Sequence, residues 1–162
     1  TDINGGIDGG QRSLRSPSSR GFNPWEFVVV TDEDTISALA RSKTHGSSFL
    51  AGAPLAIVVC ADPATSDVWI EDASIASLVL HLCAADLGLG SCWIQIRDRM
   101  HDENQSAGDH IAELLNIPSN LKIGSVVAIG HPDESKTPHA KEDLQYEKIH
   151  LNYYNRGKKD GT

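Results

Sequence analysis

The amino-acid sequence predicts an α+β fold rather than a doubly wound parallel sheet. Its length of 162 residues, with 40% hydrophobic and 22% charged residues, is typical of one globular domain. Short β-branched runs and longer helical segments follow one another along the chain. They do so without the regular strand–helix–strand alternation that a parallel sheet requires, and the sequence therefore favours α+β.

Four strands are predicted from runs of β-branched and apolar residues that end at turn residues. Phe27–Val30 is such a run and stops at Thr31 and Asp32. Leu55–Ala61 is apolar on both faces, which indicates a fully buried strand, and an Asp-Pro pair ends it. The other two predicted strands are Ser91–Ile96 and Lys122–Gly130.

Three helices are predicted between these strands. Thr31 or Asp32 can cap a helix that continues to about Ser42, and an amphipathic segment predicts another at Ala107–Leu115. The third, Ile70–Leu87, has two acidic residues near its positive N-terminal end and apolar residues around nearly its whole circumference. Such a helix must be buried on all sides, so it is either central in the fold or shared with a second subunit.

The two ends of the chain differ from its middle. Residues 1–11 contain four glycines and few apolar side chains, which predicts a flexible N-terminal segment. Residues 12–155 form the predicted single domain, and residues 156–162 a polar tail. Between about 140 and 155 the chain carries leucine, isoleucine and tyrosine side chains with no obvious partner of their own. We expect this C-terminal extension to lie across another surface, such as that of a partner subunit.

The charge and the cysteine content exclude several classes of protein. A formal net charge of −8 disfavours a nucleic-acid or anionic-membrane surface, since both would repel the chain. No apolar stretch is long enough to span a bilayer, and no secretion signal opens the sequence. Cys60, Cys83 and Cys92 are odd in number and lack the spacing of a zinc site, so we expect buried, reduced thiols and a cytoplasmic protein.

Two neighbouring segments have the chemistry of a ligand site. Gln11–Arg15 places two arginines and a serine within five residues, a donor set that suits a phosphate monoester. Pro17–Trp25 is rich in small residues that let the backbone approach a ligand, and its Asn23 can read a ring edge with alternating C=O and N–H groups. Both segments are also consistent with an ordinary surface loop that leads into the first strand.

The common catalytic motifs are missing from this sequence. It has no dinucleotide-binding G-x-G-x-x-G between a strand and a helix, no P-loop, no H-E-x-x-H and no G-x-S-x-G. His81 lies in the apolar helix, where the role of a satisfied interior histidine is more common than that of a ligand. No pair of carboxylates stands out as an acid–base couple. Any reaction is therefore expected to be carried by a bound cofactor.

Three segments are more specific together than any of them is alone: Ser16–Phe27, Leu87–Gln95, and Gly130–Pro132 followed by Lys136, Pro138 and His139. In this order around the apolar helix they resemble the nitroreductase family of FMN-dependent oxidoreductases, and the resemblance extends over most of the chain. It implies a three-layer α+β homodimer with a mainly antiparallel central sheet. Long interface helices and a C-terminal extension would intertwine the subunits, with two FMN sites between them.

The resemblance also implies which residues bind FMN. The family holds the phosphate with an arginine- and serine-rich segment and with late basic residues. It contacts the flavin through a Pro-Ser-Ser segment of the opposite subunit and lays a strand along the isoalloxazine. No side chain acts as a nucleophile or base. By position, the phosphate ligands are Arg12, Ser13, Arg15, Lys136 and His139; the ring or ribityl contacts are Pro17, Ser18, Ser19 and Asn23; and the strand residues are Trp93, Ile94, Gln95 and Ile96.

The sequence departs from the family pattern at four places. Gln11 stands where the family has the first arginine of its phosphate segment, Gly21 stands where it has an asparagine, and Asn23 stands where it has a glutamine. The family carries one to two helices between its arginine segment and its Pro-Ser-Ser segment, whereas here the two abut. Leu14–Ser16 can therefore equally be the end of that missing helix.

The function that the resemblance implies is a ping-pong oxidoreductase. NADH or NADPH would pass hydride to N5 of the flavin and leave, and a small-molecule acceptor such as a nitroaromatic or a quinone would then be reduced. Two alternatives stay open. One is another flavin reaction on the same scaffold, such as reductive dehalogenation, enoate reduction or flavin fragmentation. The other is a flavin-binding dimer without enzymatic activity.

Overall fold

The computed structural model describes residues 10–154 of the chain. The predicted tail 156–162 lies outside the described residues, as does most of the predicted segment 1–11. Its last two residues open a short helical turn over residues 10–13. The chain divides into two units after Pro132, and each is described by itself.

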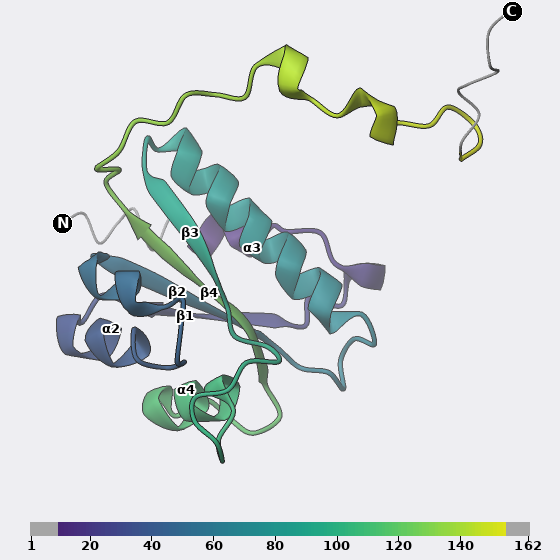
Figure 1. Ribbon diagram of the computed structural model, residues 1–162. Helices are drawn as coiled ribbons and strands as arrows, with labels where there is room; N and C mark the ends of the chain where they lie inside the picture. The colour runs from purple at the N-terminus through teal and green to yellow at the C-terminus, as the bar shows by residue number, and fades with distance from the viewer. Residues whose placement is uncertain (1–9, 155–162) are drawn as a thin grey trace, which may run out of the picture. The chain divides into compact units, whose positions relative to one another are not determined.

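A four-stranded antiparallel sheet forms the centre of the first unit (Figure 1). Its strands are β1 (Trp25–Val30), β2 (Leu55–Ala61), β3 (Gly90–Gln95) and β4 (Lys122–Gly130), in the order β1-β2-β4-β3. All three pairings are antiparallel, as between Val58 and Val126, which confirms the predicted α+β class. Each strand agrees with its predicted range to within two residues at either end.

The sheet lies between two layers of helix. Side chains alternate along a strand, so those of Ile57 and Val59 pack with one hydrophobic cluster and those of Val58 and Cys60 with another. All seven residues of β2 are buried, as its uninterrupted apolar sequence predicts. Helix α3 (Trp69–Asp86) covers one face, and α2 (Glu33–Leu39) and α4 (Ala107–Leu115) cover the other (Figure 1).

The two short helices begin at side-chain caps. The carboxylate of Asp32 accepts a hydrogen bond from the Thr35 amide at 2.9 Å, and the hydroxyl of Ser106 accepts one from the Asp109 amide at 3.0 Å. The N-terminus of α2 therefore lies where it was predicted, but the helix ends at Leu39 and does not reach Ser42. The bounds of α4 agree with the prediction.

Helix α3 differs from the prediction that it is buried on all sides. Its inner face packs Ala76 and Leu80 against the sheet, with 0% and 1% of their surface exposed. On the outer face Ile75, Leu78 and Leu82 are 40%, 55% and 61% exposed. The helix is therefore not central in this chain, and an apolar strip of three residues, Ile75, Leu78 and Leu82, lies open along it.

The second unit holds two short 3-10 helices, Lys141–Asp143 and Tyr146–Lys148. All of its described side chains are exposed, among them Ile149 and Leu151 at 75% and 82%. Among the described residues, no helix has the length and apolar character needed to cross a bilayer.

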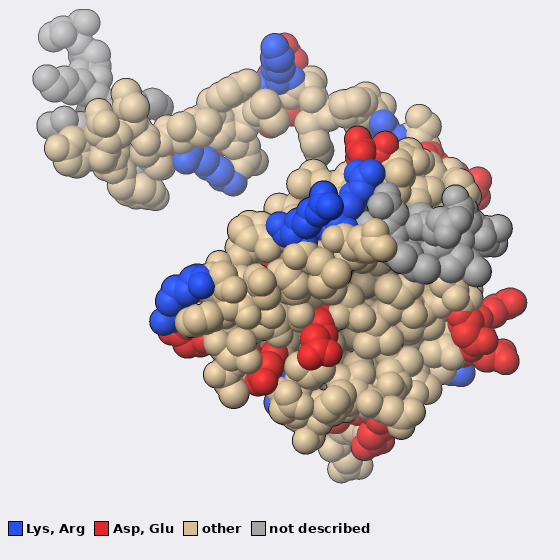
Figure 2. Space-filling view, turned by 180° about the vertical axis from the view of Figure 1, so that it is seen from behind, with Lys and Arg blue, Asp and Glu red and all other residues tan. Residues whose placement is uncertain are grey.

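Basic and acidic side chains are interspersed on the surface. On the face drawn in Figure 2, Lys and Arg side chains lie in small separate groups between Asp and Glu side chains. Cys60 and Cys83 are buried as predicted, whereas Cys92, on the edge strand β3, is exposed. All three are free thiols.

Candidate functional site

The predicted Pro-Ser-Ser segment enters a short loop with an unusual backbone. Arg20, Gly21 and Asn23 all have positive φ values, of 52°, 68° and 48°. Glycine adopts this conformation freely, but for the other two it costs roughly 1 kcal/mol or more each. The hydroxyl of Ser18 closes the loop, since it accepts a hydrogen bond from the Asn23 amide at 2.9 Å and donates one to the Asn23 side-chain oxygen at 2.7 Å. The structure thus brings together two predicted ligand residues.

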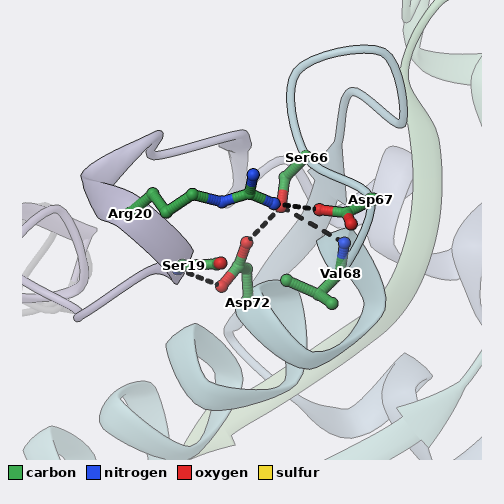
Figure 3. Close-up of polar contacts among 6 residues, drawn as sticks. All are labelled: Ser19, Arg20, Ser66, Asp67, Val68 and Asp72. Carbon is green, nitrogen blue, oxygen red and sulfur yellow. Dashed lines mark hydrogen bonds and ion pairs between the residues drawn. The ribbon is translucent and has the colours of Figure 1, made fainter.

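A buried carboxylate lies directly under this loop (Figure 3). Asp72, in the first turn of α3, is only 2% exposed. One of its oxygens accepts a hydrogen bond from the Ser19 amide at 2.8 Å, and the other accepts one from the Ser66 hydroxyl, also at 2.8 Å. Arg20 pairs with Asp67 at 2.5 Å on the exposed side of the same loop. In the sequence, Asp72 is one of the two acidic residues near the N-terminal end of this helix, where a negative charge suits the helix dipole, and no local pattern marks it as part of a site.

The predicted flavin strand, β3, is an edge of the sheet. The backbone carbonyl of Gln95 accepts a hydrogen bond from Lys43 Nζ at 3.1 Å, whereas the Ile96 amide donates to the carbonyl of Gly124 in β4. Since N–H and C=O of one residue point to the same side of a strand, the backbone groups of Gln95 and Trp93 point away from β4. Burial and the nearby charge of Arg99 lower the pKa of Lys43.

Side chains of β3 divide between the two faces of the sheet. Ile94 and Ile96 are each 1% exposed and belong to the core, so only their backbone can reach a ligand. Trp93 and Gln95 face the α3 side, where the indole N–H donates to the Gln95 side-chain oxygen at 3.0 Å. The Gln95 amide nitrogen in turn donates to the Arg97 carbonyl at 2.9 Å.

A small cavity of about 70 Å³ lies between α3 and β3. Ligand pockets usually measure roughly 300 to 1,000 Å³, so this cavity alone has no room for a three-ring ligand. Its lining residues are Ile70, Ala73, Ser74, Trp93, Gln95, Arg97, Gly124 and Ser125. Within a single copy of the chain, the cavity beside Gln95 is therefore too small to enclose such a ligand.

His81 lies further along α3, beside the same strand. Its Nδ1 is 2.7 Å from the Ser91 hydroxyl, and its ring stacks over that of Trp93 with 6.5 Å between the centroids. Burial lowers the pKa of this imidazole. The contacts agree with the role of a satisfied, half-buried histidine.

The predicted phosphate ligands of the first unit, Arg12, Ser13 and Arg15, differ in their surroundings. Arg12 pairs with Asp86 at the C-terminal end of α3, with 2.9 Å between nitrogen and oxygen. Ser13 is buried and Arg15 is exposed. The other two, Lys136 and His139, belong to the second unit, and stay predictions.

A larger groove of about 870 Å³ lies along α4 and the loop that follows β3. Of the predicted ligand residues it contains only Ile96. The groove shares Arg97 with the small cavity but is lined by neither Trp93 nor Gln95.

The matching family model bears the description "Nitroreductase family" and covers residues 37–131, more than half of the chain. The chain belongs to the nitroreductase family. A relative from Archaeoglobus fulgidus named "Putative NADH dehydrogenase/NAD(P)H nitroreductase" is 36% identical over 135 residues, which are 81% of this chain and 74% of the relative. The predicted family is thereby confirmed.

This nitroreductase-family chain is similar to solved structures of both high and low sequence identity. An FMN-dependent nitroreductase from Clostridium difficile R20291 is 44% identical, with a TM-score of 0.91 over 94% of this chain and 89% of that one. An iodotyrosine deiodinase bound to FMN and 3-iodo-L-tyrosine is 21% identical, with a TM-score of 0.68 over 92% of this chain and 90% of that one. The second likeness concerns the fold alone.

Proposed function

We propose that this chain is an FMN-dependent oxidoreductase that takes electrons from NADH or NADPH and reduces a small organic acceptor, such as a nitroaromatic or a quinone. The observation that carries the proposal is the edge of β3, where the backbone of Trp93 and Gln95 points outward beside the small cavity. The similarity to an FMN-dependent nitroreductase at 44% identity supports it.

The donor set of the chain fits FMN. A flavin ring edge alternates hydrogen-bond donors and acceptors, which the side-chain amide group of Asn23 can match. Arg12, Ser13 and Arg15 have the donor groups that suit a phosphate monoester, although within this chain Arg12 pairs with Asp86 and Ser13 is buried. Of the remaining predicted ligands, the hydroxyls of Ser18 and Ser19 suit the ribityl chain or the ring, and Pro17 belongs to the same segment.

The residues of this chain bind and orient, and none of them acts as a base or nucleophile. When bound, FMN supplies the two-electron carrier between the nicotinamide and the acceptor. The outward backbone groups of β3 would hold the flavin ring, and the side chain of Trp93 would exclude water on the α3 side. Backbone donors fixed in a sheet stabilise developing negative charge without having to reorganise.

A second copy of the chain completes the site in this proposal. The cavity at Gln95 is too small by itself, and the apolar strip of Ile75, Leu78 and Leu82 is open on the same helix. Contiguous exposed apolar surface of this kind is typical of an interface. The C-terminal extension, with Lys136 and His139, would pack on the partner and add to the phosphate site there. A cytoplasmic location stays a prediction.

The visible spectrum of purified protein incubated with FMN and then gel-filtered tests this function. The expected result is a yellow dimer whose flavin absorbance is bleached by NADH or NADPH and restored by a nitroaromatic or a quinone. A colourless protein would overturn the assignment. Bound flavin that neither nicotinamide reduces would favour the alternative of a flavin-binding dimer without activity.

A further inference from the structure

The loop that joins the Pro-Ser-Ser segment to β1 is tied to distant residues at both of its ends. At the end next to β1, the Pro24 carbonyl accepts a hydrogen bond from the Asp62 amide at 2.9 Å. Ser19 and Asp72 are 53 residues apart, and the Ser19 amide donates to the Asp72 carboxylate at 2.8 Å. The other ties of residues Ser18–Asn23 are local or exposed. Ser18 bonds to Asn23 five residues away, and Arg20 and Asp67 form an ion pair whose side chains are 61% and 74% exposed. Exposed ion pairs contribute little, so Asp72 is the main long-range fixed point of the residues Ser18–Asn23.

The carboxylate of Asp72 is itself held in place. Ser66 donates its hydroxyl hydrogen to the second oxygen at 2.8 Å, and the same hydroxyl accepts a hydrogen bond from the Val68 amide at 3.3 Å (Figure 3). Asp72 and Ser66 are each 2% exposed. A carboxylate buried to this degree is costly unless its oxygens are hydrogen-bonded, and here each of them has a partner.

The anchored loop needs such support because of its backbone. The φ values of Arg20 and Asn23 are 52° and 48°, a conformation that non-glycine residues persist in only where the surroundings hold them. The Ser19 amide bonded to Asp72 immediately precedes the first of these residues. The loop carries Ser18, Ser19 and Asn23, all of them proposed FMN contacts.

We propose that Asp72 is a positioning residue of the flavin site, whose buried carboxylate holds the Ser18–Asn23 loop in the conformation that contacts FMN. The proposal rests on the proposed function for its ligand, but the contact it invokes lies within one chain. Asp72 does not touch the flavin in this account. It acts through the backbone amide of Ser19.

Four variants separate this role from a general loss of stability. Asp72→Ala removes both bonds, while Asp72→Asn keeps an oxygen for the Ser19 amide and an N–H₂ group for the Ser66 hydroxyl. Ser66→Ala removes one bond to the carboxylate. Its matched control is Ser47→Ala, because Ser47 is a 1% exposed serine whose hydroxyl also donates at 2.8 Å, but to the Ala40 carbonyl near α2.

Two measurements are made on each variant. Hydrogen exchange of the peptide that covers residues 17–23, in protein stripped of flavin, reports the loop alone. Quenching of flavin fluorescence on titration with FMN reports the dissociation constant. Since hydrogen bonds to charged groups are among the stronger ones, Asp72→Ala is expected to raise both the exchange rate at Ser19 and the FMN dissociation constant about 10-fold or more.

The other variants set the limits of the proposal. Asp72→Asn should restore both values to within about 3-fold of wild type, and Ser66→Ala should give intermediate values. Ser47→Ala should lower the melting temperature without changing either value. If Asp72→Ala fails to fold, Ser66→Ala and Asp72→Asn still test the contact.

Two results would overturn the proposal. One is an unchanged exchange rate at Ser19 in folded Asp72→Ala or Ser66→Ala, and the other is a loosened loop that binds FMN as tightly as wild type. Wild-type protein that binds no FMN would overturn the proposed function instead. That failure is recognisable, because exchange in the flavin-free chain still reports whether Asp72 holds the loop.

Discussion

The two faces of α3 are both apolar, but only one of them is covered in this chain. The inner face presents small residues such as Ala73 and Ala76, together with Leu80, to the sheet. The outer face presents the larger Leu78 and Leu82, more than half exposed. Small side chains let a helix lie close to a sheet, and large exposed ones are suited to another protein surface. The size of the apolar residues thus separates two faces that hydrophobicity alone cannot.

The largest difference between the faces is expected from truncation of the inner one. Leu80→Ala should lower the free energy of unfolding by about 3 kcal/mol, because Leu80 is 1% exposed and the change leaves a cavity. Urea denaturation followed by circular dichroism measures this. Leu14→Ala is the control, since Leu14 is 58% exposed and should change stability by no more than about 0.5 kcal/mol. Equal losses at the two positions would contradict the assigned inner face.

Charging the outer face should weaken self-association and leave the fold intact. The double variant Leu78→Glu, Leu82→Glu is expected to raise the dimer dissociation constant about 100-fold, since it buries unpaired carboxylates in the proposed interface. Sedimentation velocity over a concentration series measures this. Leu114→Glu on α4, where Leu114 is 36% exposed, should leave the dimer unchanged. A double variant with the dimeric mass of wild type would argue against this interface.

Polar groups differ between the two sides as well. Ser77 is fully buried and its hydroxyl lies 3.0 Å from that of Ser125 on β4, while Ser74 is only partly buried and its hydroxyl donates to the Ile70 carbonyl. Ser77→Ala is expected to cost about 1 kcal/mol of stability, because the Ser125 hydroxyl loses its partner. The matched change Ser74→Ala should cost less than half of this. Thermal unfolding compares the two, and the reverse order would be inconsistent with the observed burial.

The smallest expected effect is a dependence of stability on pH. Burial lowers the pKa of His81 in the folded chain, so the unfolded chain binds more protons as the pH falls below about 6.5. Stability from this group is therefore present above that pH and is lost as the pH falls toward the folded pKa. His81→Gln should reduce the fall in melting temperature between pH 7.5 and 5.5, whereas His45→Gln, at an exposed position, should not. The fall should persist in part, because the pKa of His110 is lowered too, by burial and then by His101.

Much of the fold could be predicted because its signals are local. Leu55–Ala61 is apolar in every residue, and the caps Asp32 and Ser106 lie where short polar residues precede helical periodicity. The predicted end of α2, at about Ser42, lies three residues beyond its observed end at Leu39, since no glycine or proline follows Leu39 closely. Local patterns indicate where a helix begins more clearly than where it ends.

The candidate site depends more on contacts between distant residues. The hydrogen bond between Asp72 and Ser19 joins residues 53 positions apart, and that between Lys43 and the Gln95 carbonyl joins residues 52 positions apart. Neither contact can be predicted from a local sequence pattern. The family resemblance named the residues of the Pro-Ser-Ser loop and of β3. It named neither Asp72 nor Lys43, because they act on the backbone of those segments.

The outward edge of β3 has a consequence for how the protein tolerates change. In the proposed function, this edge would offer FMN the peptide groups of residues such as Gln95, while the side chains of Ile94 and Ile96 are buried in the core. A peptide N–H is present in every amino acid except proline. Substitutions at the outward positions would therefore change the side chains around the ligand but keep the backbone N–H groups. Only a substitution to proline would remove one of these groups.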